Sequence, residues 1–441
     1  MDSISSVRNS GGSLDGLTLL RFTYAFDSGG GIEQYLSDLN NALLVNHGMT
    51  IIHVHYKKGL KNSRVRVVEQ GRGKIIYVAL PPAIPKFQEW NGTAARDSFL
   101  KSITKKVMRE KLLYNPLLTK FFSAYRNALS AKPLGISAKE AGELFNKLHK
   151  NFDINLIVFH CLGGFDTAKI IELAGQRKIP YVYMNHYAND KFKHVCIREQ
   201  IRCAGGVAGV SSCAIPKYIR KTFVNLNDGI DINFFCRENI PNSSQISLKN
   251  TVLLPARICA GKGHIDLLKA AYMLKKEGSE INLVFAGRND SKEIHSHIRE
   301  LAHKHGLAGN VFFAGLCSNK KLRNLYAMCA VTVLPSRSEG FARVLLESQA
   351  MGTPVVAYNV GGVSQTMIDG KSGYLCKYKD VKKLKSAIKK LMLNEPLRKE
   401  MGDAGRQFVA DNFTLEHLAD RHREYYLNVL GNNTFTSPKG A

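Results

Sequence analysis

Short, mostly apolar runs alternate with helical apolar spacings along nearly the whole chain. The run Leu17–Tyr24 predicts a buried strand, and a glycine-rich turn follows it. Between residues 32 and 44 apolar side chains recur every three or four positions, which indicates an amphipathic helix. Gly48 ends this helix before the next predicted strand, Thr50–His55. A strand, a turn, a helix and a strand in this order form a βαβ unit.

The same alternation continues and then starts again in the second half of the chain. Strands are predicted at 154–159, 181–185, 206–210, 251–255, 281–286, 311–313, 330–334 and 354–358. Helices are predicted at 167–174, 264–274, 291–305, 342–351 and 415–430. A loose polar stretch at 225–250 predicts the linker between the two series.

The predicted fold class is therefore α/β, with two doubly wound Rossmann-like domains facing across a cleft. We expect an N-terminal domain over 1–225, a C-terminal domain over 226–412, and a final segment over 413–441. The helix in this final segment is long enough to cross back towards the N-terminal domain.

The charge of the chain does not alter the predicted fold, but it bears on which partners the protein binds. A content of 44% hydrophobic and 22% charged residues excludes a disordered or fibrous chain. The 62 basic and 36 acidic residues give a net charge of +26, so polyanionic partners must be considered. Residues 57–132 alone hold 17 basic and 4 acidic residues.

Part of this basic segment has a helical pattern. Apolar residues between 103 and 129 form a stripe beside Lys101, Lys105 and Arg109, and Pro116 divides it into two predicted helices. Two interpretations remain open: a solvated helix face packed on its own domain, or an amphipathic surface for anionic lipid.

Cysteines and apolar runs bear on the compartment. Nine cysteines without a C-x-x-C pair favour a reducing compartment and support neither a zinc site nor a disulfide framework. The first 16 residues lack the apolar core of a secretory signal, and no uncharged apolar run approaches the ~20 residues of a membrane-spanning helix. We expect a cytoplasmic protein, with peripheral contact at the inner face of a membrane.

The segment 334–357 carries the densest chemical signal. A predicted strand ends at Pro335, a loop holds Glu339 and Gly340, and a helix begins near Phe341. Free N–H groups in the first turn and the positive end of the helix dipole suit a diphosphate. Glu347, eight residues after Glu339, would lie on the order of 12 Å away along a helix. The two carboxylates could then bind hydroxyls of a sugar and of a ribose on either side of the phosphates.

A second signal, Arg257, Lys262 and Gly263, follows the first strand of the second domain. Its cations could meet the same diphosphate and neutralise the charge that develops as a nucleoside diphosphate leaves. The alternative is a surface pair in a basic protein.

In combination these motifs resemble the family-4, group 1 retaining glycosyltransferases, the glycogen-synthase-like group with the GT-B fold. The matching motifs are G-G-x-E at 30–33, R-x4-K-G at 257–263, A-G at 286–287, E-G-F at 339–341, E-x7-E at 339–347, M-G-T-P-V-V-A at 351–357 and V-G-G at 360–362. The resemblance implies a nucleotide diphosphate sugar held by the C-terminal domain and an acceptor held by the N-terminal one. It also implies retention of anomeric configuration, without a cofactor or an essential metal. UDP-sugars are the commonest donors in the family.

Residue by residue, the resemblance puts Arg257 and Lys262 on the diphosphate, Glu339 on the donor sugar and Glu347 on the ribose. His160 matches a histidine that many members place near the donor sugar, although a structural role is an equal alternative. His186 is a weaker candidate at the next strand end. The other residues assigned to the donor site are Gly30, Gly31, Gly287, Gly340, Phe341, Ala342, Arg343 and Val344.

Two positions depart from the family pattern. Gln365 stands after Gly361 and Gly362 where the family often has glutamate, which leaves a hydrogen-bonding group without a charge. Arg343 stands where glycine or a small apolar residue is common, and either a further phosphate contact or a solvent-facing side chain would explain it.

The sequence thus predicts a hexosyltransferase-class enzyme that moves a sugar from a nucleotide sugar to an acceptor hydroxyl. The expected acceptor is a lipid-linked glycan, a lipopolysaccharide or a surface polysaccharide, with segment 57–132 at an anionic membrane surface. The alternatives are a nucleotide-sugar epimerase, a glycan phosphorylase or a non-enzymatic polyanion-binding protein. Nucleic acid is disfavoured because no nucleic-acid motif accompanies the charge.

Overall fold

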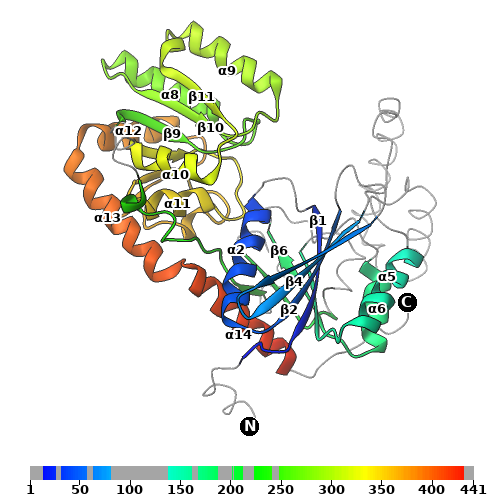
Figure 1. The fold of residues 1–441 in the computed structure, drawn as a ribbon. Coiled ribbons are helices and arrows are strands. Elements are labelled where there is room, and N and C mark those ends of the chain that lie inside the picture. The colour runs from blue at the N-terminus through cyan, green and yellow to red at the C-terminus, as the bar shows by residue number, and fades with distance from the viewer. Residues whose placement is uncertain are drawn as a thin grey trace, which may run out of the picture.

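A computed structural model of the chain describes residues 13–25, 31–56, 63–80, 138–160, 167–186, 201, 203–211, 223–240 and 248–431. The helices predicted between 103 and 129 and the site residue Gly30 lie outside these residues. The described elements form two sheets in two lobes (Figure 1).

The first lobe contains an eight-stranded sheet with the order β3-β4-β2-β1-β5-β6-β7-β8. Its strands are β1 (Thr18–Ala25), β2 (Thr50–Tyr56), β3 (Arg64–Gln70), β4 (Gly73–Leu80), β5 (Leu156–Phe159), β6 (Tyr181–Asn185), β7 (Gly206–Gly209) and β8 (Phe223–Asn225). Neighbouring strands are parallel, except that the edge strand β3 runs antiparallel to β4.

Helices cover both faces of this sheet. On one face, α5 (Ala138–Asn151) and α6 (Thr167–Gln176) bury Phe145 and Ile170 against the strands. On the other face, α2 (Gly31–Asn46) buries Leu39 beside residues of α14 (Leu415–Gly431) such as Leu418. The predicted apolar positions from Tyr35 to Leu44 form the buried side of α2.

The second lobe contains a six-stranded parallel sheet with the order β11-β10-β9-β12-β13-β14. Its strands are β9 (Leu248–Leu254), β10 (Asn282–Ala286), β11 (Val311–Gly315), β12 (Cys329–Leu334), β13 (Val355–Tyr358) and β14 (Gly373–Cys376). Its helices are α8 (His264–Lys276), α9 (Lys292–Lys304), α10 (Asn319–Met328), α11 (Arg343–Ala350), α12 (Val381–Leu393) and α13 (Glu395–Asn412). Three core clusters of the described residues pack on the faces of this sheet.

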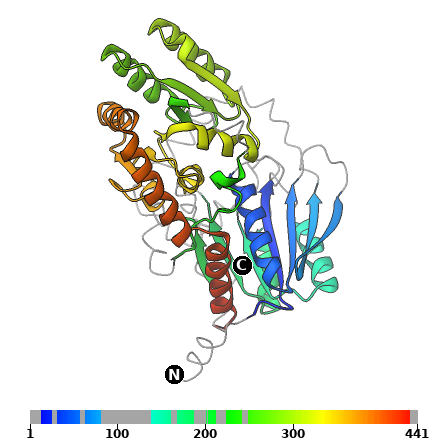
Figure 2. The same ribbon diagram turned by 60° about the vertical axis from the view of Figure 1, so that its left-hand side comes forward.

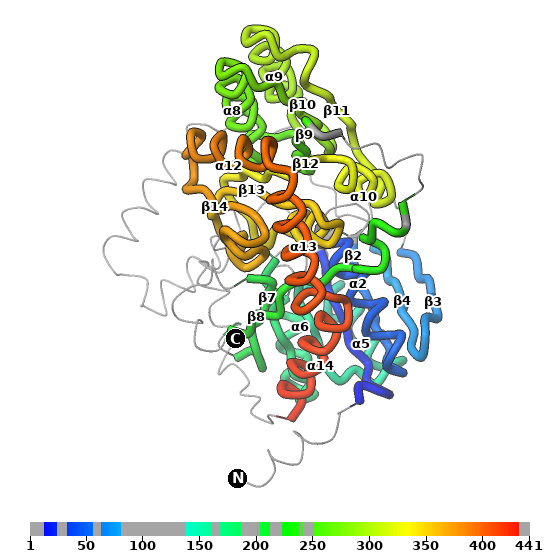
Figure 3. The backbone as a smooth tube through the Cα atoms, turned by 90° about the vertical axis from the view of Figure 1, so that its left-hand side faces the viewer, coloured from blue at the N-terminus to red at the C-terminus, as the bar shows by residue number. Residues whose placement is uncertain are grey.

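The C-terminal helices connect the lobes. Helix α13 buries Met401 and Val409 in the cores of the second lobe, whereas α14 buries its apolar side in the first. Figures 2 and 3 show α13 and α14 running one after the other from the second lobe to the first. The chain passes between them at Phe413 and Thr414, where Thr414 pairs with Ile230 as an isolated parallel bridge.

The predicted fold class is confirmed, since both sheets are doubly wound and parallel apart from one edge strand. Sequence reasoning missed the strands β3 and β4, which lie inside the basic segment 57–132. The first four side chains of β3, Arg64 to Val67, are all exposed. The strand therefore lacks the alternation of buried apolar and exposed polar residues that would have identified it. Among the helices of the described residues, none is long and apolar enough to cross a membrane.

Replacing Leu418 by alanine tests the role of α14 in the first lobe. The Leu418 side chain is fully buried, so Leu418→Ala should cost about 2–5 kcal/mol of stability through lost burial and a cavity. Leu393→Ala is the control because its side chain is 71% exposed, and its melting temperature should stay within error of the wild type. Differential scanning calorimetry measures both, and equal melting temperatures would show that α14 does not stabilise the fold.

Candidate functional site

The strand order of the second sheet determines where a ligand can bind. The order reverses direction between β9 and β12, so the loops that leave these strands diverge and leave a crevice at the carboxyl edge. The two loops nevertheless contact each other at one point, where the Arg337 amide donates to the Gly261 carbonyl at 2.9 Å. This contact brings the motifs around Lys262 and Glu339 together, as the sequence predicted.

Two glycines make this close approach possible. Gly263 has a φ of +75°, and a Cβ there would lie 1.9 Å from the Pro335 carbonyl oxygen. Gly287, a predicted site residue after β10, lies against the loop after β9, where a Cβ would be 2.1 Å from the Ala256 carbonyl oxygen. Any larger residue would force these loops apart.

Lys262 and Glu339 form an ion pair in this crevice. The Lys262 Nζ lies 2.6 Å from Glu339 Oε1, and the two side chains are 21% and 12% exposed. Glu339 lies in the loop before α11, which begins at Arg343, so the spacing of Glu339 and Glu347 is not a distance along one helix. A partly desolvated lysine beside a carboxylate is suited to bind phosphate oxygens while the carboxylate accepts from hydroxyls.

Arg257, the other predicted cation, lies at the edge of the crevice. Its guanidinium donates to Asp290 at 2.8 Å, and Arg288 donates to the same carboxylate at 2.6 Å. The bond from Arg288, followed by that from Arg257, holds the pKa of Asp290 below its usual value. Arg288 was not predicted, although it directly follows the A-G motif at 286–287.

A small cavity lies beside these loops. Its volume is about 230 Å³, and Gly261, Gly263, His264, Pro335 and Arg337 are among the residues that line it. Burial, followed by the charge of Lys262, lowers the pKa of His264 to about 4, so this imidazole is neutral at physiological pH.

Glu347 is buried beneath the crevice on α11. Its Oε2 accepts a hydrogen bond from the Tyr326 hydroxyl at 2.9 Å, and its Oε1 accepts from Arg343 Nε at 3.2 Å. Burial raises the pKa of the Glu347 carboxyl, and the charge of Arg343 partly offsets that rise. Tyr326 was not predicted, because its contact with Glu347 depends on how α10 packs against α11.

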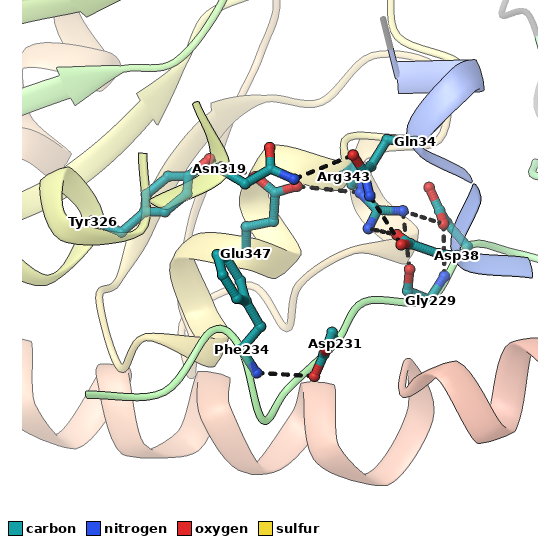
Figure 4. Close-up of polar contacts among 10 residues, drawn as sticks. Gln34, Asp38, Gly229, Asp231, Phe234, Asn319, Tyr326, Arg343 and Glu347 are labelled. Carbon is teal, nitrogen blue, oxygen red and sulfur yellow. Dashed lines mark hydrogen bonds and ion pairs between the residues drawn. The ribbon is translucent and has the colours of Figure 1, made fainter. Parts of the chain in front are cut away.

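The Arg343 side chain is buried, so the predicted solvent-facing position is wrong. The guanidinium donates to four acceptors, namely Asp38 Oδ2, Asp228 Oδ1 at 2.9 Å, the Gly229 carbonyl at 3.0 Å and Glu347 Oε1 at 3.2 Å. Figure 4 shows Arg343 between Asp38 of α2 and Glu347 of α11. These bonds use four of the five N–H groups, so one N–H on Nη2 remains for a phosphate contact, one of the two predicted roles.

The neighbouring predicted residues contact protein through their side chains. Phe341 packs on Phe413 with ring centroids 5.8 Å apart, Ala342 is buried, and Val344 packs on the same small cluster as Ala342. Gly340 lies in the loop that approaches Gly362. Contacts of the backbone amides at these positions with phosphate therefore stay a prediction.

The first lobe contributes a pair of histidines. His160 follows β5 and His186 follows β6, and their rings stack with His160 Nδ1 2.8 Å from His186 Nε2. Burial, followed by the charge of Arg21, lowers the pKa of His160 well below its usual value and that of His186 to about 3. The Nε2 atom of His160 is buried and has no hydrogen-bond partner among the described residues.

Tyr35 of α2 connects this pair to α14. Its ring contacts His186 edge-on at 4.9 Å, and its hydroxyl lies 2.7 Å from His422 Nε2. His422 Nδ1 lies 2.9 Å from the Leu418 carbonyl, which can only accept, so Nδ1 donates and Nε2 accepts from Tyr35. The ring positions near the crevice therefore depend on α14.

Contacts between the lobes show that the two carboxyl edges face each other. Asn319 donates to Gln34 of α2 at 3.2 Å, and Asn225 at the end of β8 donates to Gln365 at 3.2 Å. Gln365, where the family often has glutamate, thus bonds an amide of the other lobe. Gly31 is the first residue of α2 on this edge.

Comparisons with known proteins agree with the motifs. Residues 237–408 match the family model "Glycosyl transferases group 1". The alpha-1,3/1,6-mannosyltransferase ALG2 of Dictyostelium discoideum is 37% identical over 150 residues, which are 33% of this chain and 35% of that protein. The GDP-mannose-dependent alpha-(1-6)-phosphatidylinositol monomannoside mannosyltransferase of Mycobacterium tuberculosis is 27% identical over 212 residues, 45% of this chain and 54% of that protein. The chain therefore spans about a third to a half of the length of these curated relatives.

Solved structures resemble the whole chain. A glycosyltransferase from Rickettsia africae has a TM-score of 0.67 at 17% identity, covering 94% of this chain and 99% of that one. Anabaena HepE in complex with UDP and glucose has a TM-score of 0.64 at 14% identity, covering 93% and 99%. These similarities concern the fold alone, which is the predicted GT-B arrangement. The family match and the motifs agree on the segment 237–408, which is similar to the glycosyl transferases group 1 domain.

Proposed function

We propose that the protein is a glycosyltransferase that moves a sugar from a nucleotide diphosphate sugar to an acceptor hydroxyl. The observation that carries the proposal is the pair of Lys262 and Glu339, 2.6 Å apart at the switch point of a group 1 domain. A cation for phosphate and a carboxylate for sugar hydroxyls meet where parallel α/β sheets bind their ligands.

In this proposal the donor lies along the loops after β9 and β12. Lys262 and Arg257 bind the diphosphate and stabilise the charge that develops on it as the sugar leaves. Glu339 accepts hydrogen bonds from the donor sugar, and Glu347 from the ribose. Each carboxylate oxygen of Glu347 accepts one bond in the structure, so each keeps a lone pair for a ribose hydroxyl.

Transfer with retention of configuration is part of the proposal. The bond between the anomeric carbon and the diphosphate oxygen breaks, and the acceptor oxygen bonds to the same face of that carbon. The acceptor proton passes to the departing diphosphate, so no protein nucleophile is needed. In this proposal the neutral His160 binds a donor or acceptor hydroxyl through Nε2, which has no hydrogen-bond partner among the described residues.

The donor base and the acceptor are finer parts of the proposal. UDP is the proposed nucleotide because UDP donors are the commonest in the family that the sequence resembles, whereas the mycobacterial relative is named as a GDP-mannose-dependent phosphatidylinositol monomannoside mannosyltransferase. We propose a lipid-linked glycan as the acceptor. Contact of segment 57–132 with an anionic membrane stays a prediction, since its described part is the hairpin β3–β4 and the connecting turn.

Nucleotide binding tests the site directly. UDP or GDP should raise the melting temperature of the wild type, because a ligand that binds the folded state stabilises it. Lys262→Met should reduce that rise and lower kcat/KM for the donor by roughly 100-fold, the scale of losing one group that stabilises developing charge. Parallel samples with and without magnesium test the predicted independence from metal.

Lys389→Met is the matched control for this prediction. Lys389 also lies 2.6 Å from a glutamate, Glu277, but on α12, away from the loops after β9 and β12. This variant should bind nucleotide like the wild type. The proposed site would be contradicted if neither nucleotide raised the melting temperature of the wild type. It would also be contradicted if Lys262→Met and Lys389→Met lost nucleotide binding equally.

Acid should destabilise the protein through the buried histidines. The folded-state pKa of His160 is lowered, whereas an unfolded histidine has a pKa of about 6.5. Below pH 6.5 the unfolded state therefore binds more protons, and stability falls as the pH falls. His160→Gln removes one such group, so between pH 6.5 and 5 it should lose on the order of 1 kcal/mol less than the wild type. Urea denaturation at both pH values measures the free energy of unfolding. Identical losses of stability in the two proteins would mean that His160 titrates in the folded state as it does in the unfolded state.

A further inference from the structure

Arg343 stands at a helix position that disfavours a cation. It is the first residue of α11, where the positive end of the helix dipole and free N–H groups favour anions. The preceding residue, Ala342, makes no side-chain cap. A buried guanidinium at this position must therefore be held by acceptors from elsewhere in the fold.

Those acceptors come from three different parts of the chain. Asp38 belongs to α2 in the first lobe, Asp228 and the Gly229 carbonyl to the segment that leads into the second lobe, and Glu347 to α11 itself. In Figure 4 the guanidinium lies at the meeting point of these three elements.

All four charged side chains are removed from water. Their exposed fractions are 10% for Arg343, 10% for Asp38, 7% for Asp228 and 9% for Glu347. Burial raises the pKa of each of the three carboxyl groups, and the charge of Arg343 is the first influence that opposes the rise. The orientation of each carboxylate therefore depends on the same guanidinium.

The contacts continue on both sides of Arg343. On the first lobe, Gln34 donates to Asp38 at 2.9 Å and accepts from Asn319 of the second lobe at 3.2 Å. On α11, the other oxygen of Glu347 is held by Tyr326. Arg343 is thus the link between a residue of the first lobe and the carboxylate assigned to the ribose.

We propose that Arg343 is a positioning residue that couples nucleotide binding at Glu347 to the arrangement of the two lobes through Asp38. The proposal rests on the proposed function, because it takes Glu347 as the ribose-binding carboxylate. Arg343 donates to four acceptors, whereas a lysine ammonium has three N–H groups and no fixed fork, so we expect that lysine cannot replace Arg343 here. By linkage, nucleotide binding and the Asp38–Arg343 contact favour each other.

A double-mutant cycle on the full chain tests this coupling. Isothermal titration with UDP and with GDP measures Kd for the wild type, Asp38→Asn, Arg343→Leu and the double variant. Asp38→Asn should weaken nucleotide binding at least about five-fold, the lower end of typical coupling between sites, although Asp38 lies in the other lobe. In the Arg343→Leu background the same change should have little further effect, because the link is already broken.

Asn225→Ala is the matched control. It removes another hydrogen bond between the lobes, to Gln365, that does not involve Arg343. Its effect on Kd should be the same with and without Arg343→Leu. Arg343→Lys should behave like Arg343→Leu if the fork is required, whereas full affinity in Arg343→Lys would overturn the positioning role.

The outcomes separate this proposal from the proposed function. If neither UDP nor GDP binds the wild type, both fail. If the wild type binds and Glu347→Gln weakens binding, but Asp38→Asn has no effect or the same effect in both backgrounds, only the coupling fails. If Asp38→Asn does not show the circular-dichroism spectrum of the folded protein, Asp38→Glu replaces it in the cycle. This variant keeps the charge but displaces the carboxylate, so the expected effect on Kd is the same.

Discussion

The close approach of the loops after β9 and β12 is the constraint on which the candidate site depends. The bond between Arg337 and Gly261 and the contact of Gly263 with Pro335 hold the two loops together at one end. Because parallel strands end at the same edge, the side chains that follow this contact, Lys262 and Glu339, can form a pair. The rest of the second lobe serves to fix the two strands that carry these loops.

Charge is distributed unequally on the two sides of the crevice. The second lobe presents cations beside carboxylates, at Lys262 with Glu339 and at Arg257 with Asp290. The first lobe instead buries Arg21, whose Nη1 donates to Asn40 at 2.5 Å and whose other guanidinium nitrogens have no hydrogen-bond partner among the described residues. This buried cation adds to the effect of burial and keeps the nearby histidines neutral. The strand ends of β5 and β6 in the first lobe thus present neutral imidazoles, whereas the loops after β9 and β12 present charged side chains.

Several residues of the candidate site could be proposed from local sequence because they lie in the loops that follow strands. Lys262, Glu339, Gly287 and His160 follow β9, β12, β10 and β5, and apolar runs reveal such strands. Arg288 was not predicted, although it also follows a strand, β10. Asp38 and Tyr326 could not be found in this way, because each lies on a helix in a pattern that many surface residues share. Strand β3 was missed because its exposed side chains leave no apolar alternation, whereas β4 is a mostly buried apolar run that the same reasoning could have found.

The sequence by itself determined most strands of the two doubly wound sheets, several of their helices and the motif residues in the loops that follow the strands. These depend on apolar periodicity and on glycines at turns, which act over a few neighbouring residues. The tertiary structure alone decided that Arg343 is buried among Asp38, Asp228 and Glu347 instead of facing solvent. Its partners are 305, 115 and 4 residues away in the chain, and only the packing of the two lobes brings them together. The converging acceptors offset the cost of removing this guanidinium from water, and no local pattern records that convergence.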